Sequence, residues 1–392
     1  MSAAALGLAE RSFRAGTEYE LVVFDRLAAE EQMLLAELRE DAGFYGILRP
    51  REGSGRTIRA VDRDTALLWL GAQSPGRLPF FVWESESELP LAERRVTQLV
   101  LDGVLEIEME GAYVSGARAL DILPKRDAGA ATGRLRALSH DALRYGETLG
   151  LENPEELAAR LYTYGGVPLS PAWTRRLQNS DDVLAFLGVT PGTPLHDRLT
   201  SRFTRAADKD ESSWISWSRP SRRTPGPSEP TYKMYVSPMP EDLPKAFGEV
   251  VEMLTEHDHL QFKVGGSALG LLRADKLVVY FEDVESLQRA ANALVSRLGS
   301  VSPQGVPFSA EIALGGLLSW GMDPPRTARV LTWQGYDSWR LWIVRRLASA
   351  MLAAQHESAS DVDPSRYAME RLHLDGVDVD GWVPPNGNWW LS

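Results

Sequence analysis

The chain has 392 residues, of which 44% are hydrophobic and 24% are charged, and its formal net charge is −12. These proportions are typical of a globular protein with two or three cores, and the acidic balance argues against general nucleic-acid or anionic-membrane binding. Because there are no cysteines, disulfides, thiol catalysis and cysteine-bound metals are excluded. No segment has the apolar length of a membrane span or the pattern of a secretory signal, so we expect a cytoplasmic protein.

Residues from about 31 to 118 are predicted to form a winged-helix-like module, within a first domain of residues 1–118. Asp64 is the candidate N-cap of its second helix, and Gly103 ends its third. The stretch VLEIEMEGAYVSG alternates around Glu110 and Gly111, which predicts a hairpin that would serve as the wing. The three expected helices and the strand after the first of them are LAAEEQMLLAELRED, RDTALLWLGAQ, ERRVTQLVLDG and RTIRAVD.

A winged helix suggests DNA binding first, and the charges of this module argue against it. Between Glu31 and Arg118 there are ten arginines, no lysine and fifteen acidic residues, which is a net charge of −5. Affinity for DNA depends on neutralising phosphates with basic side chains. We therefore expect no nucleic-acid partner.

The module instead resembles the PqqD-like recognition element with which many enzymes that modify ribosomally made peptides hold a leader peptide. The likeness rests on a strand, the helix DRDTALLWL, the turn at Pro75 and Gly76, and a helix that runs into LVLDGVLEIE. It implies that a leader peptide adds a strand to the edge of the module's sheet. The alternative is a docking domain without this role.

Residues 119–200 are predicted to be a helical connector, with helices at RLRALSHDALRYGETLG, PEELAARLYTYG and SDDVLAFLG. Tyr162 and Tyr164 are interpreted as packing residues, because aromatic rings near helix ends commonly seal cores. The later segment SWISWSRP is expected to form a further strand.

Residues 201–392 are predicted to form an α+β domain. The expected order of elements is β-α-β-β-α-β, which is that of a split βαβ, ferredoxin-like sandwich. A last helix, WRLWIVRRLASAMLA, follows the candidate N-caps Asp337 and Ser338. The four strands are TYKMYV, LQFKV, DKLVVYF and VPFSAEI, and the two helices are PEDLPKAFGEVVEML and the segment from Val284 to Leu298.

Lysines interrupt apolar strand runs of this domain at Lys233, Lys263 and Lys276. An ammonium group is costly there unless it reaches water, a carboxylate or an anionic ligand. Because side chains alternate along a strand, Lys233 and Lys263 fall on the more polar face of their strands, and Lys276 shares a face with Tyr280. The four side chains could converge on one pocket, and the alternative is the solvated face of a one-sided sheet.

Two arginines of the last predicted helix, Arg340 and Arg346, are placed by the helical period. Arg346 falls within the apolar stripe, and Arg340 borders it. A guanidinium in such a stripe usually meets a carboxylate, and one that does not is a candidate phosphate or carboxylate binder. The sequence has no phosphate loop, nucleophile elbow or zinc-binding helix motif, so we assign no metal and expect no cofactor.

Several segments between about residues 230 and 355 resemble the HopA-type effector fold: YKMYV, FKVGG, LLRADKLVVYF, VPFSAEI with GGLLSWGMDPP, and the helix opened by SWR. Proteins with this domain in class V lanthipeptide and thioamitide pathways are described as lyases that expel phosphate from phosphoserine or phosphothreonine. The resemblance implies Lys233 or Lys263 as the base, with Tyr280 donating a proton or a hydrogen bond. The candidates to hold the phosphate are then Arg273, Lys276, Arg340 and Arg346.

We therefore expect a peptide-modifying enzyme whose first module binds the leader of a ribosomally made precursor peptide. Its α+β domain would eliminate phosphate from a phosphorylated serine or threonine and leave a dehydroamino acid. A separate kinase would supply the phosphate, and a cyclase is a further candidate partner. Two alternatives stay open: a non-catalytic scaffold for the precursor or the kinase, and another reaction on a modified peptide, such as cyclisation.

Overall fold

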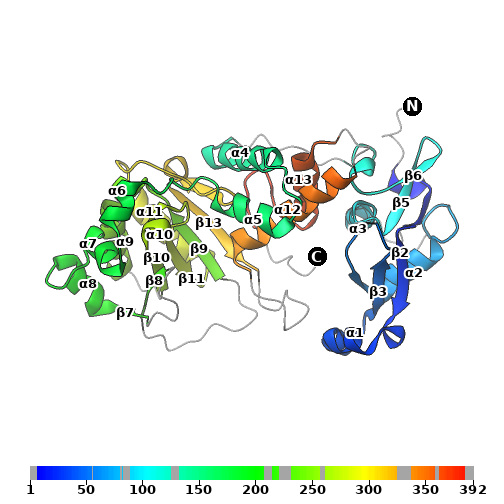
Figure 1. Cartoon of the computed structure of the whole chain (residues 1–392), viewed down its shortest axis with the longest axis horizontal. Helices are drawn as coiled ribbons and strands as arrows, with labels where there is room; N and C mark the ends of the chain where they lie inside the picture. The colour runs from blue at the N-terminus through cyan, green and yellow to red at the C-terminus, as the bar shows by residue number, and fades with distance from the viewer. Residues whose placement is uncertain are drawn as a thin grey trace. The chain divides into compact units, whose positions relative to one another are not determined.

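The computed structural model describes residues 7–54, 56–79, 82, 89–124, 132–206, 214–219, 231–256, 261–324, 337–357 and 362–384. The chain divides into two compact units, and the division passes within helix α12 (Trp339–His356) (Figure 1). Unit 1 comprises residues 1–128, 329–335 and 346–375, and unit 2 comprises residues 129–328, 336–345 and 376–392. Among the described residues, none of the helices is both long enough and apolar enough to cross a membrane.

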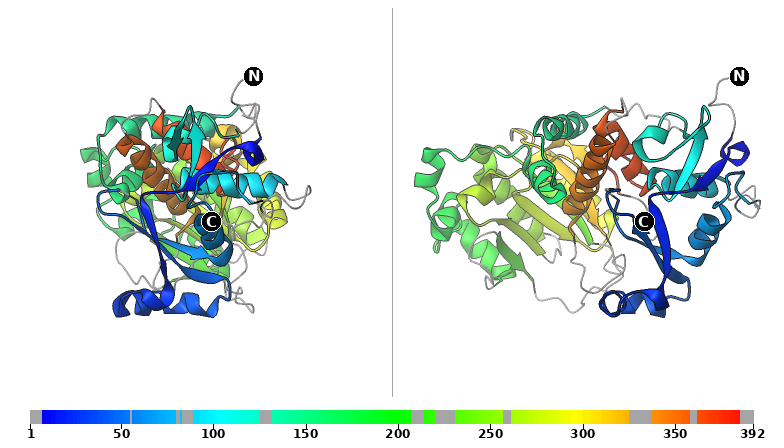
Figure 2. Two further views of the ribbon diagram at one scale, coloured as in Figure 1. Left: turned by 90° about the vertical axis from the view of Figure 1, so that its right-hand side faces the viewer. Right: turned by 45° about the vertical axis from the view of Figure 1, so that its right-hand side comes forward.

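Unit 1 contains two small antiparallel sheets, with strand orders β2-β3-β4 and β1-β5-β6 (Figure 2, blue and cyan). The strands are β1 (Phe13–Ala15), β2 (Tyr19–Val23), β3 (Phe44–Pro50), β4 (Arg59–Asp62), β5 (Leu105–Met109) and β6 (Ala112–Val114). The helices are α1 (Ala29–Leu34), α2 (Arg63–Gly71), α3 (Leu89–Leu101) and α13 (Pro364–Leu374). Short 3₁₀ turns are η2 (Leu8–Glu10), η3 (Phe24–Arg26), η4 (Ala36–Glu40) and η7 (Gly116–Ala119).

The predicted wing is present as the hairpin of β5 and β6. Glu110 and Gly111 form its turn with φ angles of 53° and 83°, and two consecutive positive φ angles are the signature of a type I′ turn. The cap of α2 differs from the prediction, because the side chain of Asp62 accepts a hydrogen bond from the Thr65 amide at 2.6 Å. Asp62 is therefore the N-cap in place of Asp64, since α2 follows β4 without an intervening loop.

The strand that completes the sheet of this hairpin was not predicted from the sequence. The segment RTIRAVD does contain a strand, β4, but β4 pairs with β3. The hairpin pairs instead with β1, through Phe13, Arg14 and Ala15. A strand of three residues is too short for alternation to be recognised in a sequence.

Helix α13, which the sequence analysis did not predict, completes the core of unit 1. Tyr367 is 2% exposed within the core cluster that surrounds α3, and its hydroxyl donates a hydrogen bond to the Leu101 carbonyl at 2.9 Å. Arg371 of the same helix forms an ion pair with buried Asp102 at the end of α3. A C-terminal segment is thus part of the core of the N-terminal unit.

Unit 2 is built on one seven-stranded sheet. Its strands are β7 (Thr204–Arg205), β8 (Trp214–Ser218), β9 (Thr231–Val236), β10 (Gln261–Gly265), β11 (Leu277–Phe281), β12 (Ala310–Ala313) and β13 (Leu318–Asp323). Its helices are α4 (Arg134–Thr148), α5 (Pro154–Thr163), α6 (Pro171–Arg176), α7 (Ser180–Phe186), α8 (Pro194–Arg202), α9 (Leu243–Glu256), α10 (Ala268–Leu272) and α11 (Val284–Arg297). The 3₁₀ turns are η8 (Pro240–Asp242) and η9 (Leu314–Gly316).

The sheet has the strand order β12-β13-β9-β11-β10-β8-β7, and neighbouring strands are antiparallel. Its central part, β13-β9-β11-β10 with α9 and α11, has the order of a split βαβ sandwich, so the predicted α+β class is confirmed. The fourth strand is β13, however, and VPFSAEI contributes only part of the edge strand β12. Gly315 and Gly316, with φ angles of 62° and 83°, reverse the chain and bring β13 against β9.

The two faces of the sheet have different neighbours. Met234 and Val236 of β9 belong to a large apolar core that includes Phe247 of α9 and Leu287 of α11. Tyr235, between them in the sequence, packs in a separate small cluster on the opposite face. The alternation expected along TYKMYV is therefore confirmed, and the face that carries the lysines lies opposite the main core.

Replacement of two glycines of unit 2 by alanine is expected to change the stability of the protein in opposite directions. A Cβ atom on Gly321 of β13 would lie 2.3 Å from Cδ1 of Trp339, whereas a Cβ atom on Gly248 of α9 would have no neighbour within 4 Å. We expect Gly321→Ala to lower the free energy of unfolding by about 1–3 kcal/mol through overpacking. We expect the matched Gly248→Ala to raise it by about 1 kcal/mol through helix propensity. Urea titrations measure both changes, and a neutral Gly321→Ala would contradict this packing.

Candidate functional site

Two strand lysines meet around one tyrosine on the face opposite the main core. Tyr280 of β11 lies directly across from Lys233 of β9, and Lys263 of β10 pairs with Val278, two residues before Tyr280. The ring centroid of Tyr280 is 5.3 Å from Nζ of Lys233 and 5.7 Å from Nζ of Lys263. The register of the sheet thus brings the three predicted catalytic residues together.

Lys263 is the least neutralised cation of this group. Its Nζ lies 4.1 Å from the ring centroid of Trp214 of β8, and within the described part of the chain it has no hydrogen bond or ion pair. Burial, followed by the positive charge of Lys233, lowers the pKa of Lys263 to about 8. An amine with this pKa is partly neutral near pH 7, as a general base requires.

Lys233 and Tyr280 differ from Lys263 in their surroundings. Lys233 is 7% exposed and forms an ion pair with Asp323 at the end of β13. Burial and the charge of Asp323 raise the pKa of the Tyr280 phenol above its usual value. Tyr280 therefore keeps its proton at neutral pH and can donate a hydrogen bond.

Arg273 borders the same cluster on the side of Trp214. Its guanidinium carbon lies 4.9 Å from the centroid of that ring, so Arg273 and Lys263 share one aromatic platform. Nε and Nη2 of Arg273 donate to Asp275 at 2.8 and 2.9 Å, and Nη2 also donates to the Tyr162 hydroxyl at 3.2 Å. Burial alone would lower the pKa of Arg273, but the bonds to Asp275 outweigh it and keep the guanidinium charged.

Asp275 joins this arginine to a second one. Nη1 of Arg340 lies 2.9 Å from Oδ2 of Asp275, in ion-pair contact although not aligned for a hydrogen bond. Arg340 is 1% exposed and also donates to the carbonyls of Pro307 at 3.2 Å and Tyr162 at 2.7 Å. Burial would raise the pKa of Asp275, yet Arg340 and Arg273 hold it well below the usual range.

The charges of this cluster do not balance. Lys233, Lys263, Arg273 and Arg340 are cationic, and the carboxylates that meet them in the described residues are Asp275 and Asp323. Two positive charges are therefore left over on one face of the sheet when Lys263 is an ammonium ion, and one is left over when its amine is neutral. Partly buried excess charge attracts an anion more strongly than the same charge in open water does.

The other two predicted phosphate binders lie elsewhere. Nζ of Lys276 is fully buried and donates to the Pro238 carbonyl at 2.8 Å and to Oε1 of Gln304 at 2.6 Å. Lys276 is also four residues from Tyr280, which is about 13 Å along a strand. Arg346 belongs to unit 1 and pairs with Asp375 at 3.0 Å, the carboxylate partner that the sequence analysis left open. Neither side chain reaches the cluster.

Four members of the cluster were not selected from the sequence: Trp214, Asp275, Asp323 and Tyr162. Tyr162 was interpreted as a packing residue, but its hydroxyl also donates to Oδ2 of Asp275 at 3.0 Å. The two aspartates stand next to strands that carry predicted site residues, in RADK and GMDPP. A carboxylate that close to strand lysines was the available signal for both.

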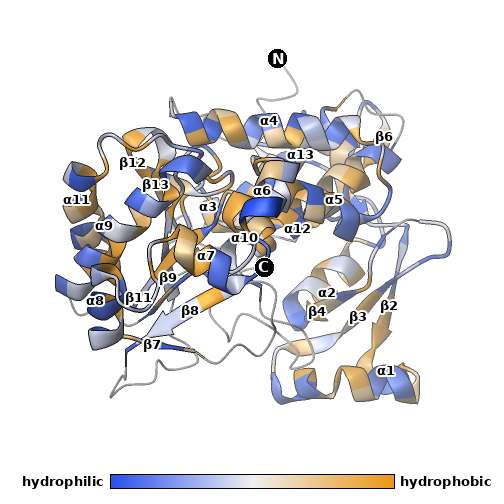
Figure 3. Ribbon diagram, turned by 60° about the vertical axis from the view of Figure 1, so that its left-hand side comes forward, coloured by the Kyte–Doolittle hydropathy of each residue, from blue (hydrophilic) through white to orange (hydrophobic). Residues whose placement is uncertain are grey.

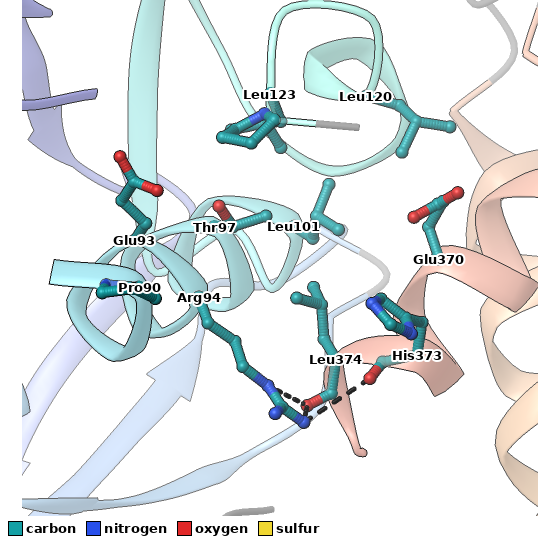
Figure 4. A pocket seen from close by; sticks show the side chains of 11 residues that line it. Pro90, Glu93, Arg94, Thr97, Leu101, Leu120, Leu123, Glu370, His373 and Leu374 are labelled. Atoms are coloured by element: carbon teal, nitrogen blue, oxygen red, sulfur yellow. Dashed lines mark hydrogen bonds between the residues drawn. The ribbon is translucent and has the colours of Figure 1, made fainter. Parts of the chain in front are cut away.

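Two cavities of unit 1 lie among other residues. One, of about 270 Å³, lies between α3, α13 and the segment after η7 (Figure 4). Arg94 closes one side of it by donating to the carbonyls of Leu374 and His373. The second has about 750 Å³ and lies beside α2. Neither contains a predicted site residue, and among the described residues no group of three or more His, Asp or Glu side chains is placed to hold a metal ion.

Comparison with known proteins yields structural neighbours only. Searches of protein-family models and of curated protein sequences give no match. Among solved structures, the effector protein from Pseudomonas syringae pv. tomato strain DC3000 is similar over 64% of this chain and 99% of its own length, with 11% identity and a TM-score of 0.40. The effector protein from Pseudomonas syringae pv. syringae strain 61 covers 64% and 98%, with 12% identity and a TM-score of 0.39. Similarity at this level carries no argument about activity.

The surroundings of Lys263 predict an unusual titration. Reaction of lysine amines with acetic anhydride follows the neutral fraction, so we expect half-maximal labelling of Lys263 near pH 8, against about 10.4 for an ordinary lysine. Lys233→Met removes the nearest like charge and should move this midpoint to higher pH. Peptide mass spectrometry after labelling at several pH values measures both. A midpoint of Lys263 labelling as high as that of an ordinary lysine would contradict this electrostatic description. So would a midpoint at lower pH in Lys233→Met than in the unchanged protein.

Proposed function

We propose that this protein eliminates phosphate from phosphoserine or phosphothreonine of a peptide and leaves a dehydroamino acid. The observation that carries the proposal is Lys263, a lysine with a lowered pKa that lies beside Lys233, Arg273 and Tyr280 in a cluster with excess positive charge. The reaction needs a base for a weakly acidic proton and cations for a leaving dianion. This cluster offers both.

In the proposed reaction, the neutral amine of Lys263 removes the proton from Cα of the phosphorylated residue. The electron pair of that C–H bond forms the Cα=Cβ double bond, and the Cβ–O bond breaks as phosphate leaves with its electrons. Lys263 is then an ammonium ion and returns its proton to water or to the departing phosphate. These steps are redox-neutral, because the proton leaves Cα without electrons and the phosphate takes the electron pair of the Cβ–O bond, so no electron acceptor or donor is needed.

The remaining residues stabilise charge in this scheme. Arg273 uses Nε and Nη2 for Asp275 and Tyr162, which leaves Nη1 to face the phosphate. Lys233 adds a second positive charge, and its pairing with Asp323 holds it in place. Tyr280 donates its proton to the peptide carbonyl as negative charge develops there. Lys276, Arg340 and Arg346 stay outside the proposed chemistry because their charged groups are engaged within the fold.

The test is the intact mass of a phosphorylated peptide after incubation with the protein. We expect the loss of one phosphoric acid per modified residue, with a rate about 100- to 10,000-fold lower for Lys263→Met. Lys245→Met is the matched control, because Lys245 bonds only Ser300 at the surface in the described structure. An unchanged mass at saturating peptide would contradict the lyase, and equal rates for the two variants would remove Lys263 as the base.

A scaffold that binds the phosphorylated peptide without reacting is the second candidate. The observation in its favour is that Lys233 and Arg273 already have carboxylate partners, Asp323 and Asp275. Such a site could hold phosphate by charge and lack a base. Saturable binding of the phosphorylated peptide without a change of its mass would identify the scaffold.

We further propose that unit 1 binds the leader of the precursor by strand addition at β4. β4 is an edge strand of the β2-β3-β4 sheet, and its ends are tied to α3 by Arg59 with Asp102 at 2.7 Å and by Asp62 with Arg95 at 3.2 Å. Peptide β-augmentation adds an extended strand to a sheet edge of this kind. A kinase would phosphorylate the same precursor beforehand, and a cyclase would consume the dehydro product.

This leader site predicts a local change in hydrogen exchange. Amides of Arg59–Asp62 should exchange more slowly when full precursor peptide is present, because an added strand would bond the outer edge of β4. The edge strand β6, in the other sheet, is the internal control. Protection that is absent from β4, or equal at β6, would contradict the assignment.

A further inference from the structure

Exposed apolar side chains are concentrated in one part of unit 1. Ten large apolar residues of the described structure are exposed, and five of them lie between positions 33 and 70. These five are Met33 at 75%, Leu34 at 57%, Ile58 at 57%, Leu67 at 54% and Leu70 at 47% exposure. Scattered surface leucines need no explanation, but contiguous exposed apolar side chains mark an interaction surface, and two of these five, Leu67 and Leu70, line one groove.

Leu67 and Leu70 face a groove. They are three residues apart on α2 and so share one helix face, whereas their neighbours Ala66, Leu68 and Trp69 are buried. The groove, with a volume of about 750 Å³, runs between α2 and the segment from η3 through η4 to β3. Phe24, Phe44 and Tyr45 supply most of its remaining apolar wall.

One side of the rim of this groove, the segment from Asp25 to Asp41, is acidic, whereas α2 on the other side contributes Arg63 to the lining. The segment from Asp25 to Asp41 contains six acidic residues and two arginines. Arg39 forms an ion pair with Asp25 at 3.6 Å, and Glu31 forms one with Arg49 at 2.7 Å. Asp41 lines the groove without an ion pair, and Glu30 and Glu40 are likewise exposed and unpaired within the described residues. Figure 3 shows the resulting mixture of hydrophilic and hydrophobic bands on α1 beside β2 and β3.

We propose that this groove binds an amphipathic helix that carries lysine or arginine, presented by another polypeptide. An apolar floor takes the leucine-type stripe of such a helix, and the acidic rim pairs with its basic flank. A second copy of this chain fits poorly, because a two-fold contact would place the same acidic segment against itself. The surface is distinct from the lysine cluster and from the β4 edge, so the proposal does not depend on the lyase.

The probe is a synthetic helix of about 18 residues, with leucines at i, i+3, i+4 and i+7 and lysines on the opposite face. Fluorescence anisotropy of the labelled peptide against the full chain should give saturable binding that weakens as salt is added. One control peptide replaces every lysine by glutamate. A second keeps the composition and scrambles the positions of the leucines.

Variants of the protein locate the binding. Leu67→Ser with Leu70→Ser removes apolar contact and should raise the dissociation constant about 10- to 100-fold. Glu30→Lys with Glu40→Lys should weaken binding and flatten its salt dependence. Leu91→Ser is the matched control, because Leu91 is 51% exposed on α3 and does not line the groove. All the substituted side chains are exposed, so the variants are expected to fold.

Any of the following outcomes would overturn the proposal. No saturable binding of the basic helix would exclude this class of ligand, and equal binding of the acidic or scrambled peptide would exclude the charge or the stripe as its basis. Binding that the Leu67→Ser/Leu70→Ser variant retains would place the contact elsewhere. Self-association of the wild-type chain that this variant loses would show that a second copy occupies the groove.

Discussion

The buried carboxylate of Asp275 is the interaction on which the candidate site depends. It forms ion pairs with Arg273 and Arg340 and accepts a hydrogen bond from the hydroxyl of Tyr162. Three separate parts of unit 2, α5, α12 and the loop before β11, are thereby fixed against one face of the sheet. A buried ion pair adds little net stability, but loss of one partner is costly, about 3–5 kcal/mol, because the other charge stays buried. The network therefore specifies an arrangement more than it strengthens the fold.

That arrangement separates the cations into two groups. Arg340 and Lys276 are buried and bonded to fixed backbone and side-chain groups, so they hold the fold. Lys263 and Arg273 keep part of their surface around Trp214, so they can meet a ligand. In the described residues, Asp275 and Asp323 are too few to neutralise Lys233, Lys263, Arg273 and Arg340, and this imbalance is the physical basis for proposing an anionic substrate. The lowered pKa of Lys263 has the same origin, since burial and a like charge both disfavour its ammonium form.

Long periodic segments of the fold could be predicted, and short ones could not. TYKMYV is β9 residue for residue, and the bounds of α9 and α11 lie no more than three residues from the expected ones. β1, with three residues, and β13, which contains Gly321, have too little alternation to be recognised. The pairing of β9 with β13 in place of β12, and the pairing of the hairpin with β1, are contacts between distant segments. The sequence pattern within one segment contains no information about such pairing.

The sequence by itself determined which face of its strand each lysine and tyrosine occupies, because side chains alternate with a period of two whatever the rest of the chain does. It also indicated that Lys233, Lys263 and Lys276, which stand in apolar runs, need water, a carboxylate or an anion, and it left a shared pocket and a solvated sheet face as alternatives. Only the tertiary structure decided which of them share a site. The strand register places Lys233 beside Tyr280, whereas Lys276 lies four residues away from Tyr280. Long-range packing forms the ion pairs of Arg340 with Asp275 and of Arg346 with Asp375. These are contacts between residues far apart in the chain, and they form only when the whole fold is in place.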